Sequence, residues 1–520
     1  MVTNSEGFWG PFRRTSEVKP TRRKTLLVTY WMPRKQQQHT TRYIAYITST
    51  VHATYAILKF MEFVNRSREL EQLSRWWTRD RSFALVWGRR RVGKTLLLEE
   101  FARNKPVIFH TFEGRPLADE LAVLSRAATQ ALGVDLGRDL INRPFSSWDD
   151  LLDEICRASR NRPLLLILDE FPEALKVTPN LTNILRGAER KIRASQLRIL
   201  ICGSATRTME AIQEHREPLY GRFDLLLLVH PFEPHESALM LRDLAPADRA
   251  LVWGLAGGVP LYLSWWDQGR SIKENLLDLM CTPGQGFLAE GELAMRGEML
   301  PDLERQVLFA VANGRTTWSE VRDIVRTIPT RSLENLVDLR LVERLEPVTE
   351  SGRDSRKVRY RIADNFLAFW LGPLARFRTE INRGLGSTIL PALMSTLDDF
   401  MGPRWEAAVR QHLVEIANAG KLGTDVTAIG PFWSTRRRDQ EADQNEIDAV
   451  VLSGRNRIAT AVCEATWTRS VDGSATQRQL ERKTQALPSR SDPLTYIVAA
   501  RKEVRNATGL ITVTASDVFP

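Results

Sequence analysis

Residues 88–95 read Gly88-Arg89-Arg90-Arg91-Val92-Gly93-Lys94-Thr95 and match the pattern G-x-x-x-x-G-K-T. An apolar run, Phe83–Trp87, precedes this stretch, and a helical pattern, Leu96–Arg103, follows it. The glycines let backbone N–H groups turn inward around phosphates at the positive end of a helix dipole. In that geometry Lys94 reaches the β and γ phosphates and Thr95 ligates Mg²⁺. The stretch therefore predicts a strand–loop–helix unit that binds ATP and Mg²⁺, with a chance match in a loop as the alternative.

A second buried run ends in two carboxylates. Leu164–Leu168 reads as a strand, and Asp169 and Glu170 follow it directly. We expect Asp169 to hold the magnesium through water and Glu170 to orient or deprotonate the attacking water. Two acids after a strand are common by chance, so this prediction depends on their pairing with the phosphate loop.

Two further side chains are candidates for the same site. Ser204 follows the apolar run Leu197–Cys202, and we expect its hydroxyl to hydrogen-bond the γ phosphate or the attacking water. Arg222 follows a glycine, and an arginine there would stabilise transition-state charge in cis or in a neighbouring subunit. A plain turn serine and a solvated or structural arginine are the alternatives. Because the backbone cradles the phosphates, we expect three side chains of the loop to point away from the nucleotide: Arg89, Arg90 and Arg91.

Length and composition limit the class of protein. The chain has 520 residues, which suggests three or four domains at about 150 residues each. Hydrophobic residues make up 43% and charged residues 26%, a globular balance that excludes a disordered, collagen-like or coiled-coil chain. The four cysteines form no C-x-x-C pair, which excludes a disulfide scaffold and a zinc ribbon and predicts a cytoplasmic protein. Since no uninterrupted apolar run of about 18 residues occurs, we expect no membrane partner.

The positive charge is concentrated at the N-terminus. The formal net charge is +10, and residues 1–60 hold ten Lys or Arg and two acids, so eight of the ten charges lie there. A charge-based argument for nucleic-acid binding would therefore rest almost wholly on this segment. The segment shows no clear period, and a helical pattern begins only after Met61. We expect a basic, disordered extension, which is either an arm or the result of a natural start at Met61.

The rest of the chain predicts an α/β fold. Between residues 83 and 235 apolar runs alternate with helical patterns, and these runs include Val107–Thr111 and Leu225–Val229. Such alternation is typical of a mostly parallel sheet with helices on both faces. Residues 236–300 indicate helices broken at Gly257-Gly258-Val259-Pro260. We divide the chain into an N-terminal extension and five folded segments: 61–235, 236–300, 301–365, a helical linker at 366–398, and a second α/β segment at 399–520.

These residues together resemble the prokaryotic AAA ATPases that carry a C-terminal domain of unknown function related to PD-(D/E)XK nucleases. The similarity covers roughly residues 61–515. Besides the phosphate loop it rests on these motifs: Phe63–Arg66, Leu165–Phe171, Leu200–Ala205, Pro218–Asp224, Gly257–Leu263, Tyr360–Phe366, Phe369-Trp370 and Glu446–Asp448. The resemblance implies a P-loop ATPase core over 61–235, a helical lid over 236–300, a winged helix over 301–365 and a nuclease-like domain over 399–520. It also implies that Met61 is the natural start.

The predicted winged helix has a DNA-binding candidate surface. Helical stretches at Leu303–Ala312, Trp318–Val325 and Thr330–Leu339 precede two wing strands, Leu341–Leu345 and Val358–Ile362. Cations at the hairpin tip and beside the third helix are candidates for contacts with DNA phosphates, namely Arg353, Arg356, Lys357, Arg326 and Arg331. Nearby acids weaken this basic face, namely Glu334, Asp338, Glu343 and Glu346. A packing or protein-interaction module is therefore the alternative.

The predicted nuclease-like domain carries a second candidate metal site. Asp448 lies in one predicted strand and Glu464 ends the next, Ile458–Glu464. We expect both carboxylates to share a divalent cation, with Glu406 contributing from a helix. Thr466 stands where the nuclease pattern has a lysine, and losing such an orienting group typically costs about 10²–10⁴-fold in rate. Lys483 is a candidate replacement; the alternatives are metal binding without cleavage, and an inert or DNA-gripping domain.

Three functions follow from this reading. The first is an ATPase that hydrolyses ATP as a conformational switch, coupled to the winged helix and the nuclease-like domain, with an action on DNA left open. The second is a DNA-binding regulator in which ATP is a structural effector. The third is an ATP-regulated, metal-dependent DNA nuclease. The expected partners are ATP, double-stranded DNA and a protein whose identity the sequence leaves open.

Overall fold

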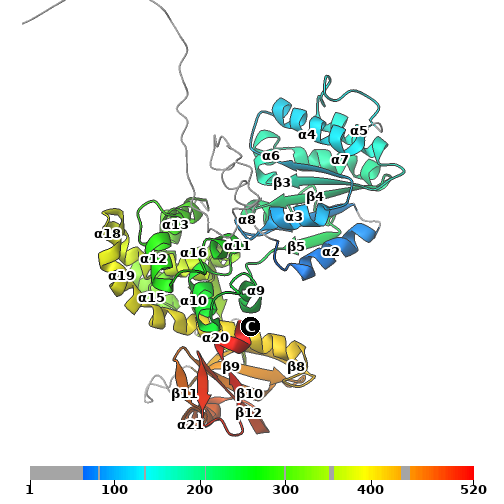
Figure 1. Ribbon diagram of the computed structural model, residues 1–520. Coiled ribbons are helices and arrows are strands. Elements are labelled where there is room, and N and C mark those ends of the chain that lie inside the picture. The colour runs from blue at the N-terminus through cyan, green and yellow to red at the C-terminus, as the bar shows by residue number, and fades with distance from the viewer. Residues whose placement is uncertain are drawn as a thin grey trace, which may run out of the picture. The chain divides into compact units, whose positions relative to one another are not determined.

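The computed structural model describes residues 63–79, 82–133, 136–204, 206–297, 300–350, 357–434 and 445–520 (Figure 1). The predictions for the N-terminal extension, 1–60, and for a start at Met61 lie outside these residues. The predicted phosphate contacts at Arg353 and Arg356 also lie outside them. Within the described residues, no helix is both long and apolar enough to cross a membrane.

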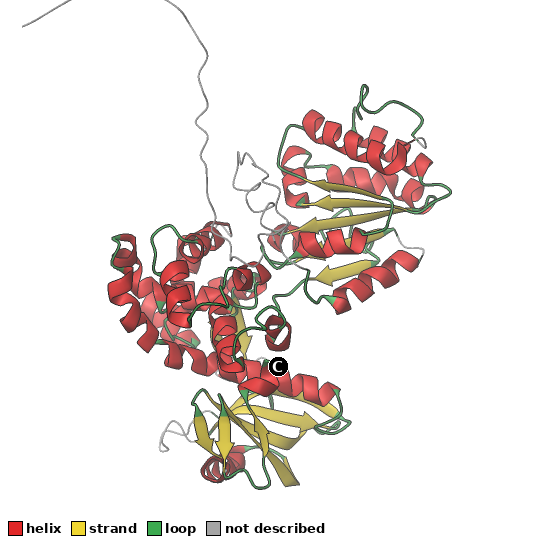
Figure 2. Ribbon diagram, viewed as in Figure 1, coloured by secondary structure: helices red, strands yellow, loops and turns green. Residues whose placement is uncertain are grey.

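The first sheet is parallel and has the strand order β2-β3-β4-β1-β5. Its strands are β1 (Phe83–Trp87), β2 (Val107–Thr111), β3 (Leu164–Asp169), β4 (Leu197–Gly203) and β5 (Leu225–Leu228). Strands β1, β3 and β4 are buried along their whole length because helices cover both faces of the sheet, as Figure 2 shows. The predicted α/β fold with a parallel core sheet is confirmed.

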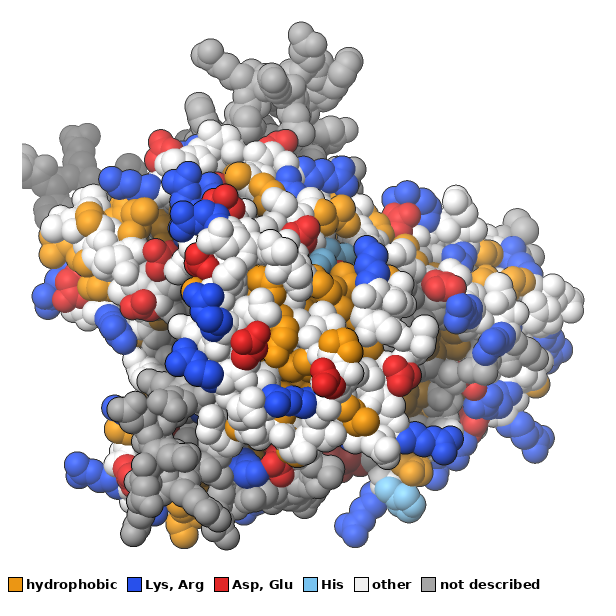
Figure 3. Space-filling view, turned by 90° about the horizontal axis from the view of Figure 1, so that it is seen from below, with side chains coloured by type: hydrophobic (Ala, Val, Ile, Leu, Met, Phe, Trp, Pro, Cys, Tyr) orange, Lys and Arg blue, Asp and Glu red, His pale blue; other side chains and the backbone are white. Residues whose placement is uncertain are grey.

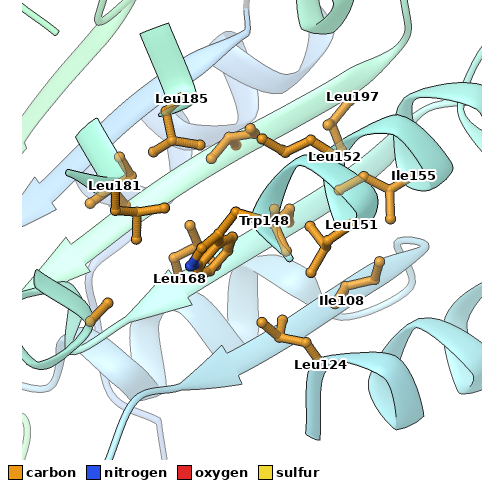
Figure 4. Packing of buried hydrophobic residues seen from close by; sticks show 14 of the residues in the cluster. Ile108, Leu124, Trp148, Leu151, Leu152, Ile155, Leu168, Leu181, Leu185 and Leu197 are labelled. Carbon is orange, nitrogen blue, oxygen red and sulfur yellow. The ribbon is translucent and has the colours of Figure 1, made fainter. Parts of the chain in front are cut away.

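Two hydrophobic clusters fill the space between this sheet and its helices. One face packs against α4 (Leu117–Leu132), α5 (Trp148–Ala158), α6 (Phe171–Val177) and α7 (Leu181–Arg193). Figure 4 shows Trp148 and Leu151 of α5 directed toward strand residues such as Leu168. The other face packs against α2 (Ser67–Thr78) and α3 (Lys94–Ala102). These layers fix the carboxyl ends of the strands, where the loops of the candidate site begin.

Several element bounds differ from the sequence-based prediction. Helix α3 begins at Lys94 and not at Leu96, directly after Gly93, whose left-handed backbone (φ 88°) lies outside the right-handed helix. Strand β3 runs one residue further, to Asp169, and β5 ends one residue earlier, at Leu228. The shift in α3 matters most, since it places Lys94 and Thr95 in the first helical turn.

A series of short helices follows β4; the first lies between β4 and β5 in the chain, and the others come after β5. They are α8 (Thr206–Ala211), α9 (Pro234–Ala238), α10 (Pro246–Ala256), α11 (Pro260–Ser264), α12 (Ile272–Met280) and α13 (Gly286–Gly297). Helices α9, α10 and α11 each begin with a proline, which suits this position because proline has no N–H and an N–H there would have no partner within the helix. Gly257, at φ 72°, ends α10 in the left-handed conformation and lets the chain turn sharply into α11.

The described residues between 301 and 365 include three helices and a pair of antiparallel strands. The helices are α14 (Asp302–Ala312), α15 (Trp318–Val325) and α16 (Thr330–Asp338), and the antiparallel strands are β6 (Val342–Leu345) and β7 (Arg359–Ile362). The amide of Tyr360 in β7 also donates to the carbonyl of Thr316, 2.6 Å away, between α14 and α15. This order of elements supports a winged helix, which stays a prediction.

The C-terminal part combines helices with a second sheet. Its helical elements are α17 (Asn365–Leu371), η4 (Leu374–Phe377), α18 (Arg378–Asn382), α19 (Gly386–Ser395), α20 (Leu397–Asn418), α21 (Gly473–Lys483), η5 (Thr484–Ala486) and α22 (Ala515–Val518). The sheet has the order β14-β12-β10-β9-β8, from β8 (Val426–Trp433), β9 (Glu446–Ser453), β10 (Ile458–Thr466), β12 (Arg490–Ala500) and β14 (Ile511–Val513). β11 (Ser470–Asp472) and β13 (Glu503–Arg505) pair with each other in a separate two-stranded sheet. This is the second α/β region that the sequence predicts.

Candidate phosphate-binding site

The loop between β1 and α3 has the backbone of an anion-binding loop. Gly88, Arg91 and Gly93 all have positive φ angles, of 151°, 70° and 88°. A Cβ atom on Gly88 would lie 2.3 Å from the carbonyl oxygen of Val229, so only glycine fits there. No side chain caps the N-terminus of α3, which leaves its first N–H groups available to a phosphate.

Lys94 lies within this loop. Its side chain is almost fully buried, and Nζ donates hydrogen bonds to the carbonyls of Gly88 and Arg89, both at 2.9 Å. A buried ammonium held by carbonyl oxygens can exchange those partners for phosphate oxygens. The lysine is therefore placed where the motif requires it.

Thr95 and Asp169 form the pair that fits a magnesium ion. Thr95 Oγ1 donates to Asp169 Oδ2 at 2.8 Å, and the carboxylate is buried at the end of β3. A hydroxyl and a carboxylate are hard oxygen ligands of the kind that Mg²⁺ prefers when it also keeps several waters. The donor set therefore fits the ion.

Glu170 and Ser204 lie side by side because β3 and β4 are adjacent parallel strands. Ser204 Oγ donates to the Glu170 carboxylate, at 3.0 Å from Oε2 and 3.3 Å from Oε1. Burial, and then the neighbouring Asp169, raise the pKa of Glu170, while Lys94 opposes them. A raised pKa brings a carboxylate closer to the range in which it can take a proton from water.

Arg222 is engaged away from these groups. Its Nε donates to the carbonyl of Pro218 at 3.1 Å, and its guanidinium contacts Glu189 on α7. These contacts fit the structural alternative given above for this residue. A role for Arg222 in charge stabilisation stays a prediction.

Four residues that the sequence reasoning missed hold the loop from outside. Arg89 forms an ion pair with Asp364, and Arg91 forms one with Glu290 at 2.5 Å. Arg66 donates to the carbonyls of Val92 and His230, both at 2.8 Å, and stacks over Phe232. Tyr262 donates to Glu290 at 3.2 Å. Arg90 is exposed. Of the missed residues, Arg66, Tyr262 and Asp364 fall in the motifs that carried the family resemblance, but those motifs did not indicate what they touch.

The comparisons with known proteins agree with this geometry. Residues 63–265 match the model of a family described as an ATPase domain predominantly from Archaea. This part of the chain is therefore similar to an ATPase domain. Residues 370–480, beyond the ATPase domain, match a family of archaeal and bacterial proteins of unknown function. The expectation of an ATPase core followed by a C-terminal domain of unknown function is thus confirmed, whereas the winged helix and the nuclease likeness stay predictions.

One relative extends over most of the chain, and others match parts of it. An uncharacterized protein of Methanocaldococcus jannaschii is 25% identical over 455 residues, covering 85% of this chain and 96% of the relative. An uncharacterized ATP-binding protein of the same organism is 48% identical over 46 residues, covering 9% of this chain and 78% of that protein. A solved Walker-type ATPase of Pyrococcus abyssi aligns at 22% identity with a TM-score of 0.47, covering 59% of this chain and 96% of that one.

A group of charged side chains outside the ATPase domain includes the predicted second metal site. Asp448 on β9 accepts a hydrogen bond from the amide of Ala465 at 2.7 Å. Lys483 on α21 donates to both oxygens of Glu464, at 2.7 and 2.8 Å. Thr466, at the position of the missing lysine, is exposed at the end of β10. The structure thus brings Lys483 to the acid that the nuclease pattern places beside its lysine.

Burial shapes the electrostatics of this group. Burial, and then Glu406 and Glu464, raise the pKa of Asp448 well above its ordinary value. Burial likewise raises the pKa of Glu406. The positive charge of Arg410 is the strongest effect in the opposite direction. A metal site needs several His, Cys or acid side chains close together. Among the described residues, a group of three with ligand atoms within 4.8 Å of one another occurs only at Glu233, His235 and Glu415. A cation shared by Asp448 and Glu464 stays a prediction.

Proposed function

We propose that the ATPase domain binds ATP with Mg²⁺ and hydrolyses it. The observation that carries this proposal is the convergence of five side chains at the carboxyl ends of β1, β3 and β4, where Thr95 contacts Asp169 and Ser204 contacts Glu170. Ligands of open parallel sheets bind at this edge of the strands. The contributing residues are Lys94, Thr95, Asp169, Glu170 and Ser204.

Each residue has a distinct part in the proposed reaction. The loop amides and Lys94 bind the β and γ phosphates, and Thr95 and Asp169 hold the magnesium ion, which when bound neutralises phosphate charge. Glu170 accepts a proton from the attacking water, and Ser204 holds the Glu170 carboxylate in position. The water oxygen forms a bond to the γ phosphorus as the bond to the bridging oxygen breaks, which yields ADP and phosphate.

The test is an ATPase assay combined with calorimetric ATP binding. Glu170→Gln should bind ATP like the wild type and lose about 10²–10⁴-fold in kcat, the usual contribution of a general base. Glu173→Gln is the matched control, because Glu173 lies on the adjoining helix and pairs with Lys176 at 2.7 Å. Normal hydrolysis by Glu170→Gln would remove this residue from the reaction. Absence of ATP binding by the folded wild type would overturn the whole proposal.

The proposal includes a conformational switch in the cytoplasm. All four cysteines are buried and unpaired, which supports a reducing compartment. Contacts from the phosphate loop to Asp364 and Glu290 support coupling between the ATP site and the segments after the ATPase domain. Slow hydrolysis with two discrete conformations, measured by single-turnover kinetics and small-angle scattering, is the expected result. Fast turnover stimulated by DNA would indicate a motor instead.

Double-stranded DNA is the partner that the second function requires, and its binding has to be measured. Described cations of the predicted wing have acidic partners: Lys357 with Glu350, and Arg361 with Glu343. On the face shown in Figure 3, basic and acidic side chains are interspersed. The second function, a DNA-binding regulator, requires an affinity for duplex DNA that falls steeply with salt. Lys357→Ala should weaken that binding, and unchanged affinity would exclude this residue as a contact.

A second candidate function is metal-dependent DNA cleavage by the C-terminal domain. The specific observation in its favour is the double hydrogen bond from Lys483 to Glu464, which supports a lysine supplied from α21 in place of Thr466. Plasmid cleavage with Mg²⁺ or Mn²⁺ should then be lost in Asp448→Ala and in Lys483→Ala. Arg482→Ala, which changes the exposed neighbour on the same helix, should keep it. Cleavage that is absent, or that is indifferent to both substitutions, would retire this function.

A further inference from the structure

The phosphate loop forms ion pairs with two acids that lie outside its flanking strand and helix, β1 and α3. Arg89 pairs with Asp364, and Arg91 pairs with Glu290. The two acid side chains are only 7% and 9% exposed, and those of the arginines 26% and 21%, so solvent screens these pairs weakly. Two of the loop's three arginines are therefore fixed by segments that lie far along the chain.

Asp364 uses both of its oxygens. Oδ1 accepts from the amide of Leu367 at 2.7 Å and caps the N-terminus of α17, while Oδ2 contacts Arg89. Gly257 gives this carboxylate its space, because a Cβ there would lie 2.7 Å from Oδ2 and 3.0 Å from the amide nitrogen of Phe366. The glycine turn between α10 and α11 is thus shaped to admit Asp364 beside the loop.

Glu290 on α13 is held in a comparable way. Its Oε2 accepts from the hydroxyl of Tyr262 at 3.2 Å, and its Oε1 contacts Arg91. The ring of Tyr262 packs against Phe287 and Phe366, with centroids 5.5 and 4.7 Å away. This aromatic cluster joins α11, α13 and α17, so both acids are anchored to one packed unit.

The loop conformation explains why such anchors matter. Arg91 has φ 70°, a left-handed conformation that is unfavourable for a residue with a side chain. Positive φ angles at Arg91 and Gly93 turn successive N–H groups to one side, as in an anion-binding nest. The ion pair to Glu290 holds Arg91 in this conformation, and the pair to Asp364 holds the loop two residues earlier.

We propose that Asp364 and Glu290 are positioning residues of the ATP site, which keep the phosphate loop in its binding conformation through Arg89 and Arg91. The inference rests on the proposed binding of ATP. Nucleotide affinity is then set in part by α13 and by the start of α17. Because coupling between sites is reciprocal, bound nucleotide also stabilises the capped first turn of α17.

Conservative substitutions isolate the charges. Asp364→Asn keeps an oxygen that can cap α17, and Glu290→Gln keeps an acceptor for Tyr262. Binding of a non-hydrolysable ATP analogue with Mg²⁺, measured by calorimetry, should weaken about 5- to 150-fold in each variant, the usual range of coupling between sites. Glu292→Gln, an exposed acid on the same helix, is the matched control and should bind like the wild type.

A double-substitution cycle separates positioning from a general loss of structure. Arg89→Ala together with Asp364→Asn should bind no more weakly than Arg89→Ala alone, because the second change removes a partner that is already lost. Gly257→Ala should weaken binding in the same direction by displacing Asp364. Hydrogen exchange of the Leu367 amide should slow when the analogue binds to the wild type and should respond less in Asp364→Asn.

The outcomes are distinct. Wild-type affinity in both Asp364→Asn and Glu290→Gln would overturn this inference and leave the proposed function intact. Tighter binding would also overturn it, because the acids would then compete with phosphate for the arginines. A folded wild type that binds no nucleotide would overturn the proposed function, and this inference with it.

Discussion

Removal of the Ser204 hydroxyl tests the proposed base most directly. Ser204 Oγ lies 3.0 and 3.3 Å from the two oxygens of Glu170, in a buried site. A hydrogen bond to a charged group contributes about 1.5–3 kcal/mol. At about 1.36 kcal/mol for each factor of ten, loss of this amount in the transition state lowers kcat about 10- to 150-fold. Ser204→Ala should therefore hydrolyse ATP slowly and still bind it.

The same substitution should also change the pH dependence of the reaction. The Ser204 hydroxyl donates to the carboxylate and so favours its ionised form, which means that its removal raises the pKa of Glu170 further. The pKa of Glu170 is already raised by burial, and if Glu170 is the base, activity should fall as this group becomes protonated at low pH. The acid limb of the kcat profile should therefore move to higher pH in Ser204→Ala.

The control is a serine at the opposite end of the same strand. Ser195 precedes β4 and donates to the carbonyl of Ile192 at 2.8 Å, so Ser195→Ala also removes a buried hydroxyl. The acid limb of the kcat profile of Ser195→Ala should stay where it is in the wild type, even if this variant is less stable. A wild-type kcat in Ser204→Ala, or an unmoved acid limb, would refute the assignment of Ser204 as the residue that positions the base.

Two further predictions concern stability, and a third concerns ATP binding. Trp405→Ala empties a fully buried site and should lower the free energy of unfolding by about 3–5 kcal/mol in denaturant titration. Gly88→Ala should abolish ATP binding, measured by calorimetry, because its Cβ would collide with the carbonyl of Val229. Burial lowers the pKa of His110 below its ordinary 6.5, so the unfolded chain binds more protons near that pH and stability should fall as the pH drops through 6.5. His110→Gln should reduce this acid sensitivity in thermal melts, and an unchanged slope would contradict the assignment.

The local parts of the fold could be predicted from the sequence. β1 and β2 have the expected bounds, and β3 differs by one residue, because short apolar runs between turn residues carry their own signal. The phosphate loop could be found for the same reason, since its residues are contiguous. The place of Lys483 near the acids of the second sheet could be predicted as well, because a helix that follows a strand commonly packs back on the sheet of that strand.

The long-range contacts could not be predicted in this way. Nothing near Asp364 or Glu290 indicates that their carboxylates meet arginines of the phosphate loop, because such pairing depends on how helices pack across the chain. Arg66 likewise reads as an ordinary charge before α2, although its guanidinium is buried against Val92 and His230. The contacts of these residues depend on tertiary packing, which the spacing of hydrophobic residues in the sequence does not indicate.

The burial of the four cysteines has a practical consequence for testing the proposed switch. Burial raises the pKa of each thiol, to about 11 for Cys281, and buried, protonated thiols react poorly with alkylating reagents. The native chain therefore offers little background to maleimide dyes or spin labels. A pair of cysteines introduced at exposed positions, one on α7 and one on α15, could be labelled selectively without first replacing the natural ones. Distances between such labels would then follow each nucleotide state directly.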